Sequence, residues 1–469
     1  MNRSRATAAA MLACLAGCSS HPTLKPEVHS AVQTQWEQVP QGVATSGNLS
    51  DQPWWSVFHD PVLDRLMRLG LQNNLDLRQA RARILQARAQ SLGAKAALWP
   101  DITASFGDTY SRSPLVAPAA PASSFTAALN ASWTVDLFGE QRNQARAAQA
   151  TLQATEFDRD DTRITLAAQI ATNYLQYRLY QLQYAISNRS AQAQAEVVRI
   201  TRLRFEQGAA SRLDLEQVVS QLAVTRAAVP QAFEQADAAR NSLIALLAST
   251  PEALADELPA SVTVADPKLP RGDPLEVLLT PAQVIERRPD IQAAGFRLVS
   301  ASANLKSALA QRYPQLTLGG LFGSAGTAVS QLMTPGSAAR GFDYTLTLPL
   351  IDFGRIRAAI DAADAQQLEA YLTYEQTVRG ALQATQTAIV MYAQGVLRER
   401  QMSTALESAR TAARLARTQY QAGALALLNV LIAEQAEYST ELMWSEAAAA
   451  VAERLVALYQ TMGVLPPTA

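Results

Sequence analysis

Two stretches of the chain alternate apolar and polar residues with the period of a β-strand. The apolar positions of the first stretch are Phe125, Ala127, Leu129, Ala131, Trp133 and Val135. Those of the second, with polar residues or Pro349 between them, are Phe342, Tyr344, Leu346, Leu348 and Leu350. Successive strand side chains point to opposite faces, so each stretch predicts a strand with one apolar face. Residues 101–111 and 315–323 supply the partner strands, which predicts β-hairpins at 101–136 and 315–351.

These predicted strands have the length of membrane-crossing strands, which is about ten residues. The long segments at 112–124 and 324–340, rich in small residues, then form hairpin loops of the kind found on outer-membrane barrels. Alternation alone is equally typical of the edge of a soluble β-sandwich, so that alternative stays open.

Residues 140–207 contain neither glycine nor proline and predict one very long helix of about 100 Å. Its apolar positions recur at a mean spacing of about 3.7 residues, close to a straight helix rather than a tight supercoil. They are Ile164, Ala168, Ala171, Leu175, Leu179, Leu182 and Ile186. This stripe requires neighbouring helices. A plain coiled coil is the alternative.

The same short motifs, containing glycine or proline, occur twice along the chain. Phe138-Gly139 recurs as Phe353-Gly354 and Gly208 recurs as Gly423, each 215 residues later, and Trp99-Pro100 matches Tyr313-Pro314 at an offset of 214. The sequence therefore predicts two structural repeats, residues 61–260 and 280–469, joined by a connector at 261–279. Each repeat contains a helix that ends at proline, a β-hairpin, a long helix and a second helix, with the glycine marking the reversal between the last two.

The N-terminus has the features of an export signal. Residues 1–5 are basic and 6–15 are apolar, so residues 1–17 are expected to be removed. Leu15-Ala16-Gly17-Cys18 resembles a bacterial lipobox, in which Cys18 is acylated; an uncleaved signal with an incidental cysteine is the alternative. Residues 18–60 then form a lipidated linker. Its Trp54-Trp55 pair is expected to pack on the body of the protein, with a bilayer-interface role as the alternative.

Composition excludes several classes of protein. Removal of the signal leaves 38 basic and 41 acidic residues, so a nucleic-acid binder is excluded. No uninterrupted apolar span of twenty residues exists, so no transmembrane helix is expected. The only histidines, His21, His29 and His59, lie before the first repeat. We therefore expect no metal site, no catalytic residue and no enzyme activity.

Strands that cross a membrane must close into a barrel, because lipid satisfies no backbone hydrogen bond. Two hairpins give only four strands, fewer than the eight of the smallest barrels. The barrel must therefore be shared between copies. Two copies give eight strands and three give twelve, and the residues alone do not choose.

With these features together, the chain resembles the TolC-family outer-membrane channels, specifically the lipidated NodT-like type. The resemblance rests on the lipobox, the repeated Pro and Phe-Gly pairs, residues 286–290 and residues 205–217 with their Ser-Arg-Leu-Asp-Leu core. It implies a mainly α fold with a membrane β-barrel: a homotrimer whose twelve-strand barrel is continued by a periplasmic α-helical barrel.

The resemblance also implies a function. The chain would be the outer-membrane channel subunit of a tripartite efflux system, a passive conduit from periplasm to exterior, lipid-anchored in the outer membrane and extending into the periplasm. Its partners would be a periplasmic adaptor protein, an inner-membrane RND pump and outer-membrane lipid, with no cofactor except the lipid on Cys18. A type I protein-secretion channel and a periplasmic coiled-coil scaffold lipoprotein without a pore are the alternatives.

The resemblance also implies two sets of candidate site residues, one at the predicted reversals and one on the helix after the second reversal. The tip residues Gln207, Gly208, Ala209, Ala422, Gly423 and Ala424 are expected to contact the adaptor, although turn geometry alone also explains the glycines. On the helix after the second tip, Leu428 and Ile432 are expected to form apolar rings that constrict the periplasmic entrance. Ordinary helix packing is the alternative for this pair.

Overall fold

The computed structural model describes residues 35–37, 39, 53–111, 122–259, 267–273 and 277–467. The expected signal segment, Cys18 and most of the 18–60 linker lie outside the described residues. The chain divides into two compact units. The first unit contains residues 88–152 and 294–374, and the second contains 30–87, 153–293 and 375–469.

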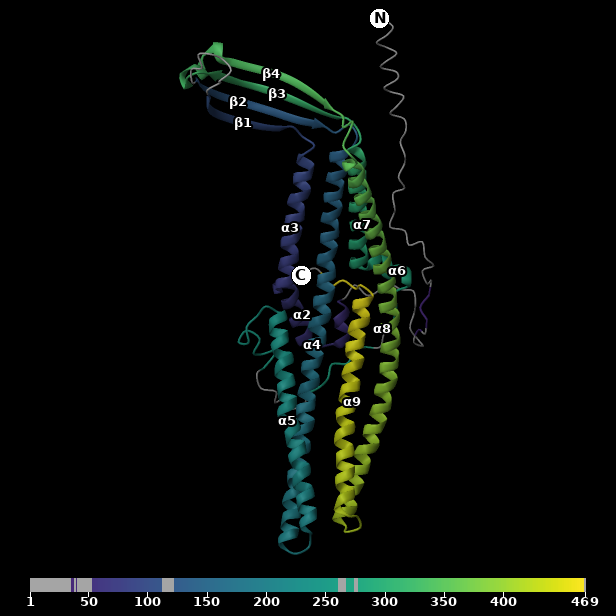
Figure 1. The fold of residues 1–469 in the computed structure, drawn as a ribbon. Helices are drawn as coiled ribbons and strands as arrows, with labels where there is room; N and C mark the ends of the chain where they lie inside the picture. Colours follow the sequence, from purple (N-terminus) through teal and green to yellow (C-terminus); the bar gives the residue numbers. More distant parts are fainter. Residues whose placement is uncertain are drawn as a thin grey trace. The chain divides into compact units, whose positions relative to one another are not determined.

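The first unit holds a four-stranded antiparallel sheet in the order β1-β2-β3-β4 (Figure 1). Its strands are β1 (Asp101–Ser111), β2 (Ala122–Val135), β3 (Gln315–Gly326) and β4 (Ala338–Thr347). Both predicted hairpins are present, and they join through β2 and β3, with Val135 opposite Leu316. The two hairpins, far apart in sequence, therefore form one continuous sheet.

The register gives this sheet one apolar and one polar face. Leu129 pairs with Phe322 and Trp133 pairs with Leu318, so the alternating apolar positions fall on the same side. That side carries Ile102, Phe106, Leu129, Trp133, Leu318, Phe322, Phe342, Tyr344 and Leu346. The opposite side carries Thr103, Ser105, Thr126, Asn130, Ser132, Thr134, Thr317, Asp343 and Thr345. The predicted alternation is confirmed as a face, and its large side chains, such as Phe342 at 73% and Ile102 at 70%, are exposed.

The second hairpin differs in detail from its prediction. β4 ends at Thr347, opposite the first residue of β3, and not near residue 351. Beyond Thr347 no described strand lies opposite this segment to bond with it, and Pro349 has no amide hydrogen to donate. The loop predicted at 324–340 is shorter than expected, because β3 continues to Gly326 and two 3-10 turns, η3 (Val329–Met333) and η4 (Pro335–Ser337), fill what remains.

The helices repeat the same plan twice. The first repeat has α2 (Pro61–Asn73), α3 (Leu75–Ala96), α4 (Glu140–Glu206) and α5 (Arg212–Leu246). The second has α6 (Pro281–Arg287), α7 (Pro289–Ala310), α8 (Arg355–Gln421) and α9 (Leu427–Thr461). α4 and α8 contain 67 residues each and begin 215 positions apart, which confirms the duplication.

Local chemistry explains where these helices begin. Asp60 caps α2 by accepting the Val62 amide at 2.9 Å, and Thr280 forms a capping box with Gln283 before α6. The turns that lead into α4 and α8 contain Gly139 (φ +85°) and Gly354 (φ +90°). This left-handed conformation suits glycine, which accounts for the repeated Phe-Gly pair.

The helix predicted from residue 62 to the proline at 100 is interrupted at Asn74. The Asn74 side-chain oxygen accepts the amides of Asp76 (2.8 Å) and Leu77 (3.2 Å), while its amide donates to the Leu246 carbonyl at 2.8 Å. In the second repeat the break falls at Arg288, which donates to the Thr461 carbonyl at 2.7 Å. Leu246 and Thr461 are again 215 positions apart. In each repeat, the residue at the helix interruption therefore donates a hydrogen bond to the end of the last helix of that repeat.

The second unit has a large apolar core that includes part of the linker. Trp54 stacks on Tyr459 with a centroid distance of 5.6 Å, and Trp55 is 4% exposed. Farther upstream, the Trp36 indole donates to the Leu279 carbonyl at 2.6 Å. The predicted packing of the Trp54-Trp55 pair onto the body is therefore confirmed. Within the described part of the chain, no helix has both the length and the hydropathy required to span a bilayer.

Candidate functional site: the hairpin tips and the cluster between the hairpins

Helices α4 and α5 form one antiparallel hairpin and α8 and α9 form another (Figure 1). Their reversals contain the glycines that the sequence singled out. Gly208 has φ +72° and Gly423 has φ +76°. The Ala209 amide bonds the Arg204 carbonyl at 2.7 Å, and the Ala424 amide bonds the Gln419 carbonyl at 2.9 Å. Both tips thus close with the same Schellman-type bond, as the predicted left-handed glycine requires.

The two tips differ in how the following helix begins. Ser211 caps α5 in a capping box: it accepts the Asp214 amide at 3.1 Å and its own amide donates to the Asp214 carboxylate at 3.0 Å. The Ser211 hydroxyl, at 2.8 Å, and the Ser211 amide both donate to the Asp214 carboxylate, and these two bonds lower the pKa of Asp214 because they stabilise its charged form. Ala426, at the same place before α9, provides no side-chain cap. The second tip therefore leaves more of its helix N-terminus unsatisfied.

The predicted gate residues lie on the exposed side of α9. Leu428 is 53% exposed and Ile432 is 60% exposed. The neighbouring Leu427, at 8% exposure, packs in an apolar cluster with residues of α4 and α5, and Val430 is 3% exposed. The structure thus places Leu428 and Ile432 within one turn of each other and outside the apolar contact that joins the hairpins.

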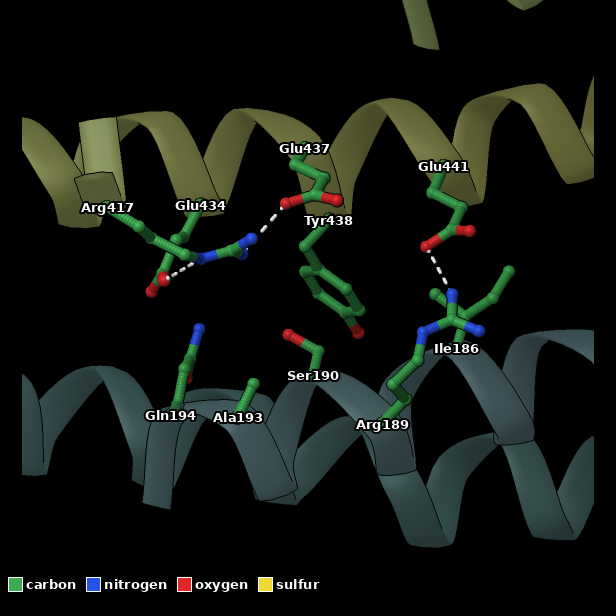
Figure 2. Close-up of a pocket in the computed structure, with 10 residues that line it drawn as sticks. All are labelled: Ile186, Arg189, Ser190, Ala193, Gln194, Arg417, Glu434, Glu437, Tyr438 and Glu441. Carbon is green, nitrogen blue, oxygen red and sulfur yellow. Dashed lines mark hydrogen bonds and ion pairs between the residues drawn. The ribbon is translucent and has the colours of Figure 1, made fainter. Parts of the chain in front are cut away.

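Above this apolar contact, charged residues join the two hairpins (Figure 2). Arg417 of α8 donates to Glu434 at 2.7 Å and to Glu437 at 2.9 Å, both on α9. Glu441 is the next acidic residue on that face. Its carboxylate accepts hydrogen bonds from Arg410 of α8 and, at 2.6 Å, from Arg189 of α4. Glu441 therefore links both hairpins through one carboxylate.

The two acidic partners of Arg417 keep it charged despite its partial burial. Burial by itself would lower the pKa of Arg417, but the hydrogen bonds and charges of Glu434 and Glu437 raise it above its ordinary value. The guanidinium therefore stays charged. Glu434 is only 7% exposed, so its carboxylate depends on that partner, since a buried carboxylate without a cation is strongly unfavourable.

A cavity of about 230 Å³ lies between α4 on one side and α8 and α9 on the other (Figure 2). Gln194 of α4 and Glu434 of α9 face it, and each has one buried oxygen without a hydrogen-bond partner in the described chain. Ordered water is the ordinary partner for such groups, and this volume admits several water molecules. Two polar contacts bridge the same interface, from Ser187 to Tyr438 (3.0 Å) and from Gln221 to Gln435 (2.6 Å).

Nearer the tips, Arg204 of α4 contacts Tyr420 of α8 in two ways. Its guanidinium donates to the tyrosine hydroxyl at 2.7 Å and lies 4.8 Å from the ring centroid. The sequence analysis did not find the residues of this interface. A signal did exist, because Glu434, Glu437 and Glu441 are spaced three and four apart, which places them on one helix face. Their arginine partners, however, come from other helices and cannot be read from spacing.

Among the described residues, no group of histidine, cysteine, aspartate or glutamate is arranged to hold a metal ion. The glutamates of α9 are instead paired with arginines. In this unit, two helical hairpins are held together by an apolar contact, by the ion pair between Arg189 and Glu441 and by neutral polar contacts.

A family model described as "Outer membrane efflux protein" matches residues 66–249 and again residues 280–464. The chain belongs to the outer membrane efflux protein family. The two matches correspond to the two structural repeats, so the family unit is itself the duplicated element. The protein is a channel subunit of the TolC/NodT type.

Similar proteins agree over nearly the full length. The pyoverdine export outer membrane protein OpmQ of Pseudomonas putida is 31% identical, covering 96% of this chain and 95% of that protein. The outer membrane protein OprJ of Pseudomonas aeruginosa is 30% identical, covering 96% and 93%. The cation efflux system protein CusC of Escherichia coli is 27% identical, covering 91% of each chain.

Solved structures show the same fold. The outer-membrane channel OprN has a TM-score of 0.85 at 28% identity and covers 94% of this chain and 99% of its own. A CusC structure has a TM-score of 0.79 at 26% identity and covers 92% and 98%. The duplicated helical and β fold is therefore that of outer-membrane efflux channels, and the chain is an outer-membrane channel subunit of an efflux system. The relatives are channels and export proteins rather than enzymes.

Proposed function

We propose that three copies of this chain form the outer-membrane duct of a tripartite efflux system. An inner-membrane RND-type pump would supply the energy and a periplasmic adaptor would connect the two. The observation that carries the proposal is the sheet: one face is apolar, the other is polar, and four strands are too few to close a barrel. Three copies supply twelve strands with the apolar face toward lipid.

In this proposal the subunit conducts solute passively and performs no chemistry. Solute passes through an aqueous lumen lined by the polar face of the strands and then by the helices. Acylation of Cys18 provides a second attachment to the outer membrane, and Trp36 and Trp54 of the linker pack on the body.

The tip residues around Gly208 and Gly423 are the proposed adaptor contacts. They are distal turns, and a Cβ added at either glycine meets no atom within 4 Å, so these surfaces are open to a partner. Leu428 and Ile432 are the proposed constriction. Their exposure on α9 supports a pore-lining role better than packing within one subunit.

Small solutes are favoured over secreted proteins as cargo. The similar proteins are named for pyoverdine export and cation efflux, and both are small-molecule tasks. The chemical identity of the solute is a property we assign mainly to the pump.

The decisive experiment combines mass and conductance. Purified acylated protein in detergent is expected to have the mass of a trimer and to produce discrete conductance steps in planar bilayers. A monomer without conductance would instead identify a scaffold lipoprotein. Deletion of the gene, followed by growth on a toxicant panel and assay of secreted proteins, separates efflux from type I secretion.

A further inference from the structure

A basic residue interrupts the apolar face of the sheet near its loop end. Arg340 of β4 lies opposite Phe322 of β3, which in turn lies opposite Leu129 of β2. Residues that lie opposite each other point to the same side, so Arg340 is on the face that carries the large apolar side chains. It is the only lysine or arginine in the four strands. In the proposed barrel this face contacts lipid, where a charged side chain is costly and marks a functional position.

The internal repeat shows that this arginine replaces an apolar residue. The offset of 215 positions maps Phe125 onto Arg340 and Val135 onto Leu350, which are the two ends of the alternating run in each copy. All the alternating positions between these ends are hydrophobic in both copies. The exchange of an apolar for a basic side chain is therefore confined to the outermost position of the second run.

The distance along the strand places Arg340 at the outer boundary of the proposed membrane band. The ten positions from Leu350 to Arg340 span about 33 Å in an extended chain. At a strand tilt of about 40° this is roughly 25 Å in height, which is the height of the apolar band on outer-membrane barrels. On β3, the next residue after Phe322 on this face is Ser324, whose hydroxyl contacts the Ser337 hydroxyl at 2.6 Å. Polar groups therefore begin near this level on the neighbouring strand as well.

The Arg340 side chain is exposed and has no partner within the described part of the chain. No hydrogen bond or ion pair joins it to another described residue. Asp108 of β1 is the other charged residue on this face, and β1 lies three strand spacings from β4, or about 14 Å. An unpaired guanidinium at the edge of a lipid layer favours an anionic partner from that layer.

We propose that Arg340 binds the phosphate group of a lipid in the outer leaflet, with the acyl chains of that lipid lying over Phe322 and Phe342. These two phenylalanines are next to Arg340 on the apolar face and are 66% and 73% exposed. A guanidinium donates two parallel hydrogen bonds to a phosphate, which the ammonium group of lysine cannot do. The inference rests on the proposed barrel and adds one lipid-binding position to each subunit.

Lipid suits this surface better than a soluble anion does. A free phosphate ion would contact only the guanidinium, whereas a lipid also removes the exposed rings of Phe322 and Phe342 from water. The loop end of the sheet is opposite the end that continues into the helices, so in the proposed channel it faces the exterior. The competing explanation is an ion pair between Arg340 and Asp108 of the partner subunit, which the experiment must separate from lipid binding.

Native mass spectrometry of the purified protein with added lipid A, a lipid that carries phosphate groups, tests the inference. We expect Arg340→Gln to bind lipid A roughly tenfold more weakly than the wild type, because a charge-assisted hydrogen bond is lost. Arg340→Lys keeps the charge without the fork and is expected to bind with intermediate affinity. Asp108→Asn is the matched control on the same face and is expected to bind as the wild type does. Dephosphorylated lipid A is expected to bind the wild type as weakly as lipid A binds Arg340→Gln.

Equal binding by the wild type and Arg340→Gln, or binding that does not depend on the lipid phosphate, overturns the inference. An equal loss of binding in Asp108→Asn overturns it in favour of the ion pair between copies. Excess inorganic phosphate is expected to leave the lipid bound, and full displacement would identify a site for a free anion instead. The same spectra report the mass of the assembly. A monomeric wild type overturns the proposed function, whereas a trimer that binds lipid A without regard to Arg340 overturns only the lipid site.

Discussion

At the scale of single residues, the first turns of α9 present apolar side chains in two directions. Leu427 and Val430 are buried, while Leu428 and Ile432 are more than half exposed. We propose that this exposed leucine and isoleucine act in the assembly or in the lumen. An apolar ring narrows a water-filled passage and favours its dewetting.

We therefore expect Leu428→Ser and Ile432→Ser each to raise single-channel conductance by roughly twofold or more, because a hydroxyl holds water where the ring excludes it. Planar-bilayer recordings measure this. Leu213→Ser is the matched control: Leu213 is the equivalent position of the first hairpin, 215 residues earlier, and is 66% exposed. Unchanged conductance in both α9 variants, or an equal rise in the control, would remove the gate assignment.

At the scale of elements, the two hairpins are copies of unequal stability at their tips. Both contain helices of 67 and 35 residues, and both close on a left-handed glycine. Only the first has a capping box, between Ser211 and Asp214. The second hairpin begins α9 at Ala426 without a side-chain acceptor, so its first turn is expected to open more readily.

Ser211→Ala is expected to destabilise the first turn of α5 by about 1 kcal/mol, which increases amide exchange there by roughly fivefold. Hydrogen exchange with mass spectrometry measures the change in the peptides around residues 212–218. Ala426→Ser is the converse variant and is expected to slow exchange at the start of α9. Equal exchange at the two tips of the wild-type protein would contradict this account.

Much of the element pattern was predictable because it depends on local rules. Strand faces follow from alternation, and the tips follow from glycine. The break at Asn74 was not predictable, because it depends on the Leu246 carbonyl, which lies 172 residues away. The end of β4 was missed for a related reason: the alternation continues to Leu350, but a strand exists only where a neighbour bonds to it.

The candidate site was less accessible from sequence than the fold. The tip glycines were located by the internal repeat, whereas Leu428 and Ile432 were predicted as a gate from the family resemblance and stay a prediction. The ion pairs between the hairpins were not, because Arg189 reaches Glu441 over 252 positions and only the packing of α4 on α9 brings them together. Long helices hide such partners, since many registers between two helices satisfy the same apolar stripe.

At the scale of the whole molecule, duplication means that each subunit offers a partner two similar but unequal tips. Gly208→Trp is expected to reduce cross-linking to the periplasmic adaptor and efflux of a fluorescent substrate, because it adds bulk to a proposed contact surface. Gly208→Ala is the matched control, since both variants place a side chain at a positive φ and only tryptophan adds volume.

Adaptor cross-linking in cells and dye efflux measure the result. If the alanine variant loses as much as the tryptophan variant, the glycine serves turn geometry alone. If the tryptophan variant retains full efflux and cross-linking, this tip is not a contact surface. The same pair of substitutions at Gly423 shows whether the second tip is used in the same way.

The unfinished edge at Thr347 has a consequence for how cells handle this protein. A single subunit that entered the bilayer would expose unpaired backbone amides and carbonyls along both edge strands. It would also expose the leucine-containing segment after Thr347 without a strand partner. Insertion is therefore favourable only when the subunits insert together with their edge strands paired. That requirement guards the cell envelope against partial, leaking pores, because an incomplete ring cannot remain in lipid.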